Sequence, residues 1–409
     1  MDDSIYRLRN HDLLLLVLLA LLGISVIMVQ SASIGVTGHQ SWKFTDLGGK
    51  QAIYAAVAVF AYLVISRVDY ARLAPQRWPW IVSPALLLVG VAALLCAAVL
   101  VPGIGFEMNG ARRWIRLGGK IQLQPSELAK WAAVIYLAWW LVYRPLNVQK
   151  FWVFLLTLVP VGVLCLLVVI QDFGTAALIA TVALAMLLVG RVKLWHLMVV
   201  VPPAMAVAYW FVAHKEYRWK RMTAFLDPYA APQGEGYHMI QSLLSFATGG
   251  LGGTGLGGGI QKLGYLPEDT TDFIFATICE EMGLVGATVI VALYVAILVL
   301  AWQAIGARRD SFGRLLAFGI AAMVATQAAI NIAVATVSVP TKGLSLPLIS
   351  SGGSGLIITA AALGVLGSIL RYPRPEPASL RKPSAASSRR ATHTPSVVDA
   401  KTWEQWTTA

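Results

Sequence analysis

Apolar residues gather in long runs, separated by short polar breaks, from about residue 12 to residue 371. Ten of these runs approach about 20 residues, the length at which an α-helix crosses the hydrocarbon core of a membrane. The pattern predicts an all-α polytopic membrane protein with about ten transmembrane helices in one domain, 12–371. The candidate spans lie near residues 12–30, 49–66, 80–101, 126–143, 151–170, 174–190, 194–213, 273–303, 315–337 and 355–371.

Basic residues indicate how these helices are oriented. Ten spans put both termini on one side, and loops rich in Lys and Arg favour the cytoplasm. The segments on the side of the N-terminus are all basic, among them 7–9, 67–77, 144–150, 191–193 and 308–314. Both termini are therefore predicted to be cytoplasmic, with 1–11 as a short leading segment. The Pro- and Ser-rich tail, 372–409, is predicted to be disordered.

Two longer loops on the predicted outer side are also basic. Residues 102–125 hold Arg112, Arg113, Arg116 and Lys120, and the large loop between spans seven and eight, 214–272, holds Lys215, Arg218, Lys220, Arg221 and Lys262. Long loops cross the membrane largely regardless of charge, so the topology stands. Positive charge on this side suits an anionic substrate head group such as a lipid-linked phosphate. The alternative is general adhesion to anionic lipid.

Composition supports the membrane class and narrows the chemistry. The chain is 57% hydrophobic and 13% charged, against about 25% charged residues in soluble domains. Its net charge of +12 is scattered among loops, which argues against a nucleic-acid partner. The cysteines, Cys96, Cys165 and Cys279, fall in apolar runs without metal-ligand spacing, so they are read as buried small residues and no metal site is predicted.

The glycine run at 249–259, GGLGGTGLGGG, contains the spacing GxGxxG. It follows no predicted strand and lies outside the membrane, so the sequence does not favour a dinucleotide-binding site here. A flexible hinge or close backbone packing is the better interpretation. The stretch before it, 237–247, is expected to form a short helix on the membrane surface.

An acidic cluster at 263–283 marks the outer end of the eighth span. Asp272 directly precedes the apolar run, where a helix N-terminus stabilises a carboxylate as the anion. It is therefore a natural base at a water-accessible mouth. Glu280 and Glu281 lie inside the run, and we interpret them as buried polar contacts between helices. In a transporter, they would instead be essential charges on the path.

Two further polar positions leave alternatives open. Glu127 and Lys130 lie three residues apart, on the same face of a predicted helix that Pro125 begins. Two compatible interpretations are a structural ion pair and the polar wall of a cavity in which Lys130 or Arg113 holds phosphate. Asp172, between spans five and six, either caps the following helix or faces a cavity.

Five motifs resemble the SEDS family of bacterial cell-wall proteins, FtsW, RodA and SpoVE, in order and spacing. They are NGARRWI with QPSELAK, QDFGTA, RMTAFLDP with GYHMIQS, QKLGYLPEDTTDFIFATICEEMGLVG, and PTKGLSLPLISSGGS. The resemblance covers about residues 8–372. The segments PTKGL and QKLGYLPE are closer to the FtsW and SpoVE branch than to RodA.

The resemblance implies a membrane glycosyltransferase that polymerises lipid II into β-1,4 glycan strands at the outer face of the bacterial cytoplasmic (inner) membrane. It also implies a class B penicillin-binding protein as partner, together with other divisome or elongasome proteins. Motif matching makes Asp272 the catalytic residue. The substrate-binding residues that it implies are Arg113, Glu127, Lys130, Arg221 and Lys342.

The implied reaction is an inverting displacement. Asp272 takes the proton of an acceptor hydroxyl, and undecaprenyl diphosphate leaves without needing an acid. The basic residues would neutralise the diphosphate, and a divalent cation, Mg or Mn, could assist. Three positions depart from the family pattern: Thr270 replaces a histidine, Ser351 a tyrosine and Gln171 a proline. The rival interpretations are a lipid II flippase and a non-catalytic scaffold for a transpeptidase.

Overall fold

The computed structural model describes residues 9–37, 47–73, 83–108, 111–117, 121–143, 148–214, 216–234, 236–306 and 310–372. The predicted disorder of the tail and the placement of 1–8 therefore lie outside the described residues. The same holds for Lys120 and Lys215, and for the side chain of Arg218.

Each of the ten apolar runs corresponds to a helix. The helices are α1 (Asn10–Thr37), α2 (Leu47–Arg67), α3 (Pro84–Leu100), α4 (Pro125–Tyr143), α5 (Phe151–Val169), α6 (Phe173–Val189), α7 (Leu194–Ala213), α10 (Ile274–Gly306), α11 (Ser311–Ala335) and α12 (Gly353–Arg371). Among the described residues, seven of these are long and apolar enough to cross a membrane by length and composition. The chain is thus a mostly helical, multi-pass membrane protein, and the count of ten spans remains a prediction.

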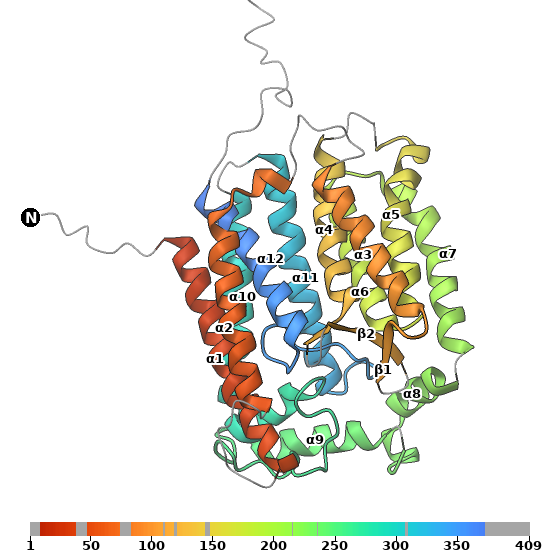
Figure 1. Cartoon of the computed structure of the whole chain (residues 1–409). Coiled ribbons are helices and arrows are strands. Elements are labelled where there is room, and N and C mark those ends of the chain that lie inside the picture. The colour runs from red at the N-terminus through yellow and green to blue at the C-terminus, as the bar shows by residue number, and fades with distance from the viewer. Residues whose placement is uncertain are drawn as a thin grey trace, which may run out of the picture. The chain divides into compact units, whose positions relative to one another are not determined.

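The helices pack in two groups that meet along α11. Helices α1, α2, α10 and α12 pack against one another, and α3, α4, α5 and α6 form the second group. Helix α11 packs on α10 and α12 on one side and on α4 and α6 on the other, as Figure 1 shows. Because α11 joins the two groups, its buried polar residues can contact both.

One end of the bundle carries most of the irregular structure, and we call it the loop end. It holds the described residues of the segments 101–124, 214–273 and 336–352 (Figure 1). Outside these segments, a 3-10 helix, η1 (Tyr70–Leu73), lies between α2 and α3 in the sequence. The two long loops that the sequence assigns to the outer side therefore do meet at one end.

A small β-sheet at the loop end is an addition to the all-α expectation. Strands β1 (Gly105–Met108), β2 (Ala111–Leu117) and β3 (Ile121–Leu123) form an antiparallel sheet in that order. Trp114 pairs with Phe106, and Ile115 pairs with Leu123. The guanidinium of Arg116 lies 3.4 Å from the centre of the Phe106 ring, a cation–π contact across the sheet. The sheet leads straight into α4.

The large loop contains two short helices. Helix α8 (Glu216–Leu226) is followed by the 3-10 turn η3 (Pro228–Ala230) and by α9 (Tyr237–Gly249). Helix α9 lies across the ends of the bundle helices in Figure 1, as expected for a surface helix. Helix α10 is interrupted at Gly283, where φ is +62°. Its first part is buried except for the partly buried Met282, and exposed side chains begin at Leu284.

Candidate functional site

A cavity of about 250 Å³ opens at the loop end, and we call it the polar cavity. The sheet, the start of α4, the segment before α10 and the segment 343–356 line it. Its polar lining residues are Arg113, Gln124, Glu127, Thr175, Arg221, Glu268, Thr271, Asp272, Gln327, Ser345, Ser350, Ser351 and Thr359. Glu268 and Leu348, which also line it, have φ of +58° and +65°. Such left-handed backbone is costly for these residue types and is concentrated at functional sites.

Asp272 lies at the wall of this cavity, two residues before α10 begins. Its backbone carbonyl accepts a hydrogen bond of 2.8 Å from Asn331 Nδ2. Burial raises the pKa of the Asp272 carboxyl to about 7, with further increases from the negative charges of Glu268 and Asp172. The cations Arg113 and Arg221 act in the opposite direction. A carboxyl with a pKa near neutrality can take a proton and release it again, as a general base must.

Arg113 and Asp272 flank Gly343. A β-carbon at Gly343 would lie 3.4 Å from Arg113 Nη1 and 3.4 Å from Asp272 Oδ2. A hydrogen bond fixes the position of the Arg113 side chain, because its Nε donates to the Gln171 carbonyl at 3.0 Å. Arg221, from α8, reaches the same cavity. The two long loops at the loop end thus bring cations from distant parts of the chain to the carboxylate.

A second cavity, of about 440 Å³, adjoins the first, and we call it the apolar chamber. Arg113, Arg221 and Gly343 line both cavities. The other walls are the start of α6, α7, α8 and the segment 339–343, with Tyr209, Trp219 and two methionines among the lining residues. Lys342 lines this chamber, with its Nζ 5.3 Å from the centre of the Phe173 ring. Burial lowers the pKa of the Lys342 amino group.

Glu127 and Lys130 form the expected ion pair. Lys130 Nζ lies 2.8 Å from Glu127 Oε1 and donates to Gln327 Oε1 at 2.7 Å. Glu127 lines the polar cavity, whereas the side chain of Lys130 is fully buried beneath it. The structure therefore favours the ion pair over direct phosphate binding by Lys130. Lys130 instead fixes a carboxylate in the cavity wall.

Two buried amides on α11 were not among the predicted site residues. Gln327 bonds Lys130 and also donates to the Ser345 carbonyl at 2.8 Å. Asn331, one turn later, donates to the carbonyls of Asp272 and of Leu344, the latter at 2.7 Å. They join the segment 343–350 to α11 and to the base. The sequence signal was two amides four residues apart in an apolar run, on one helix face.

Asp172 both caps the following helix and faces a cavity. Its carboxylate caps α6 by accepting from the Thr175 backbone N–H at 3.1 Å and from the Thr175 hydroxyl at 2.8 Å. It also lines the apolar chamber. The cap holds the start of α6 in place, next to the Gln171 carbonyl that binds Arg113.

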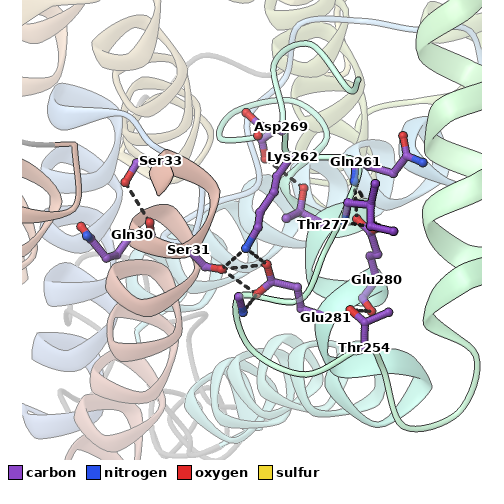
Figure 2. Close-up of polar contacts among 12 residues, drawn as sticks. Gln30, Ser31, Ser33, Thr254, Gln261, Lys262, Asp269, Thr277, Glu280 and Glu281 are labelled. Carbon is purple, nitrogen blue, oxygen red and sulfur yellow. Dashed lines mark hydrogen bonds and ion pairs between the residues drawn. The ribbon is translucent and has the colours of Figure 1, made fainter. Parts of the chain in front are cut away.

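Glu280 and Glu281 are buried polar contacts, as predicted, and Figure 2 shows their partners. Glu281 Oε1 lies 2.6 Å from Lys262 Nζ, and the hydroxyl of Ser31 in α1 donates to the same carboxylate at 2.7 Å. Glu280 accepts from the backbone N–H groups of Ile260 and Gln261. Both carboxylates are thus bound by groups of the protein itself, and neither lines the polar cavity or the apolar chamber.

The described residues contain no group of three or more His, Cys, Asp or Glu side chains placed to hold a metal ion. Cys96 and Cys279 are buried and Cys165 is partly buried, all three with free thiols. The cysteines therefore occupy the apolar surroundings that their sequence positions indicate.

Comparison with known proteins finds relatives that match most of this chain. A curated relative from Nitrosococcus halophilus, named "Probable peptidoglycan glycosyltransferase FtsW", is 38% identical over 85% of this chain and 88% of its own. One of the same name from Thioalkalivibrio sulfidiphilus is 40% identical over 86% of this chain and 87% of its own.

Two solved structures are similar as well. The first was described under the heading "Structural coordination of polymerization and crosslinking by a peptidoglycan synthase complex"; it superposes with a TM-score of 0.69 at 29% identity and covers 88% of this chain and 96% of its own. RodA, the rod shape determining protein of Thermus thermophilus, has a TM-score of 0.59 at 25% identity, over 88% of this chain and 95% of its own. The family model described as "Cell cycle protein", FtsW/RodA/SpoVE, matches residues 12–374. This chain therefore belongs to the FtsW/RodA/SpoVE family of cell cycle proteins.

Proposed function

We propose that this protein is a peptidoglycan glycosyltransferase in which Asp272 is the general base. The observation that carries the proposal is the placement of one carboxylate between a polar cavity and a group of cations. Asp272 and Arg113 flank Gly343, and Arg221 lines the same cavity. The names of the curated relatives support the reaction class.

The two cavities suit the two parts of a lipid-linked sugar substrate, here lipid II. The polar cavity offers hydroxyls, amides and carboxylates, which are the groups that bind sugars. The apolar chamber combines aromatic and methionine side chains with Arg113, Arg221 and Lys342, as a prenyl diphosphate requires. The shared wall would place the bond that breaks beside Asp272.

In the proposed reaction, the carboxylate of Asp272 takes the proton of the GlcNAc 4-hydroxyl of the acceptor. The oxygen attacks the anomeric carbon of the MurNAc end of the growing strand, and the bond to undecaprenyl diphosphate breaks. Arg113, Arg221 and Lys342 stabilise the negative charge that the leaving group gains. One displacement inverts the anomeric centre and gives the β-1,4 linkage. Glu127, fixed by Lys130, binds sugar hydroxyls.

A divalent cation, Mg²⁺ or Mn²⁺, is compatible with this site. Mg²⁺ commonly binds through substrate phosphates and only one or two carboxylates, so it needs no cluster of protein ligands. Glu268, an exposed carboxylate at the polar cavity, is the residue that could contribute. The cation would supply additional positive charge at the diphosphate.

The biological setting follows from the family and remains part of the proposal. The site would face the outer side of the cytoplasmic membrane. A class B penicillin-binding protein would cross-link the strands, together with other divisome or elongasome proteins. A solved structure similar to this chain belongs to a study of a peptidoglycan synthase complex that couples polymerisation and crosslinking.

Asp272→Asn tests the base directly. Purified protein with its cognate transpeptidase and labelled lipid II should give glycan ladders, and the variant should reduce strand formation by orders of magnitude, because an amide cannot accept the proton. Asp227→Asn is the matched control. Asp227 lies in the same loop and caps the turn η3 through its side chain, which Asn can also do. Its activity should match that of the unmodified protein.

Three outcomes would contradict the proposal. Ladders that persist in Asp272→Asn would remove Asp272 as the base. No ladders from a well-folded wild-type complex, with labelled lipid II moved across a vesicle membrane instead, would identify a flippase. Activity that comes only from the transpeptidase side would identify a scaffold.

A further inference from the structure

The loop after α9 presents apolar side chains and no exposed charge. We call residues 250–265 the apolar loop. From Met239 to Pro267 the only charged residue is Lys262, and it is 2% exposed because it turns inward to Glu281. The exposed large side chains of the apolar loop are Leu251, Leu256, Ile260, Leu263 and Tyr265, each more than half exposed. A patch of this kind marks an interaction surface.

The backbone of the apolar loop has its hydrogen bonds on the inside. Buried carboxylate oxygens of Glu281 and Glu280 accept from the N–H groups of Gly257 and Ile260, at 3.1 and 2.7 Å. The backbone carbonyl of Glu280 accepts from Thr254 at 2.9 Å. Figure 2 shows the buried carboxylates that the apolar loop surrounds. Pairing backbone groups with protein atoms lowers the cost of placing irregular backbone next to apolar surroundings, and these bonds do so for part of the loop.

The apolar loop lies at the edge of the lipid-facing surface of α10. The N–H of Leu284 donates to the Gly250 carbonyl at 3.0 Å, and the N–H of Val285 donates to the Leu251 carbonyl at 3.4 Å. Leu284 and Val285 are the first exposed residues of α10, and Trp302 is 75% exposed near its other end. Leu284 and Trp302 are 18 residues apart, about 27 Å along a helix. That length is close to the thickness of a hydrocarbon core, about 30 Å.

We propose that the apolar loop inserts into the lipid–water interface at the loop end. The occupant of this surface is lipid, because the patch continues the lipid-facing side of α10 and carries no charge that a polar partner could pair. Tyr265 fits the enrichment of Tyr at membrane interfaces. The inserted loop is continuous with the segment 266–273, so insertion holds Asp272 at a set depth near the head groups. The proposal rests on the membrane topology of α10 and holds whatever reaction Asp272 performs.

Spin labels can measure the depth of this loop. Leu256→Cys and Leu263→Cys, each labelled with a nitroxide in a phospholipid nanodisc, should collide several-fold more with oxygen relative to an aqueous nickel chelate than a label at Glu216→Cys. Glu216 is the matched water control, because its side chain is 82% exposed and charged. Val295→Cys, on the exposed face of α10, is the membrane control. The protein without added cysteine provides the blank.

Two results would overturn the proposal. Loop labels that collide with the nickel chelate as readily as the Glu216→Cys label would place the loop in water. Loop labels shielded from both reagents would show that protein covers the patch, either a second copy or a partner. The measurement does not involve lipid II, so failure of the loop proposal and failure of the proposed glycosyltransferase are distinguishable.

Discussion

Asp272 stands between opposing charges. Burial and the nearby carboxylates Glu268 and Asp172 raise its pKa, while the guanidinium groups of Arg113 and Arg221 lower it. The net result, a pKa of about 7, leaves a substantial fraction of the carboxylate ionised at neutral pH. The pKa of Asp272 therefore depends on each neighbouring charge, and substitution of a neighbour tests its contribution.

The rate of the proposed reaction should fall as pH decreases through 7, because only the ionised form of Asp272 accepts a proton. One pH unit below its pKa of about 7, about a tenth of the carboxyl is ionised, so kcat/KM at pH 6 should be about tenfold below its plateau. Glu268→Gln removes a negative charge and should move this acidic limb to lower pH. The measurement is the initial rate of strand formation from about pH 5 to about pH 9, a range that includes the ionisation of Asp272.

Glu216→Gln is the control for this series, because Glu216 is exposed and paired with Lys220, outside the residues that line both cavities. Its acidic limb should coincide with that of the unmodified protein. A limb that shifts upward in Glu268→Gln would mean that Glu268 acts on the base by another route than its charge.

At the residue scale, the sequence indicated those candidate site residues that stand out by their charge and their position in the chain. Asp272 was recognisable as an acid next to an apolar run, and Arg113 as a cation in an outer loop. The burial of Lys130 was not predictable, because it depends on Gln327 arriving from another helix. The proximity of Asp272 to Gly343 likewise depends on tertiary packing between distant segments.

At the element scale, close packing explains part of the glycine run. Gly253 has φ of +75°, and a β-carbon there would overlap the backbone carbonyl of Glu281. The neighbouring Gly252 has open space at the same position. One glycine is therefore required by its contacts, whereas the other is not.

Gly253→Ala should destabilise the protein, by about 1–2 kcal/mol for the left-handed backbone alone and by more for the overlap. Gly252→Ala should be neutral. Thermal unfolding of the two purified variants, followed by intrinsic Trp fluorescence in detergent, compares them directly. Equal melting temperatures would show that the loop relaxes away from α10 and that the packing seen here is not required.

The β-sheet is the element that the sequence did not reveal. Its strands have four, seven and three residues, too short for the alternation of apolar and polar residues to stand out. Long helices were predictable for the opposite reason, because an apolar run of about 20 residues is a strong signal. The break in α10 at Gly283 was hidden inside such a run.

At the scale of the whole molecule, both cavities open at one end of the bundle, so orientation decides which compartment supplies the substrate. Glu216→Cys lies at the loop end, and Lys150→Cys at the start of α5 lies at the other end. A membrane-impermeant maleimide added to intact cells should label the first and not the second, because the loop end is predicted to face outward. Labelling of Lys150→Cys alone would reverse the topology.

The shared wall between the two cavities has a consequence for the length of the product. In the proposed reaction each addition leaves the lengthened strand on the acceptor's lipid, while the spent lipid occupies the other side of the wall. A strand that stays bound must then shift across the line of Arg113, Arg221 and Gly343 before the next addition. Gly343 has no side chain and lies on that line, where a β-carbon would already contact Arg113 and Asp272. A larger residue at this position should therefore shorten the strands as well as slow each addition.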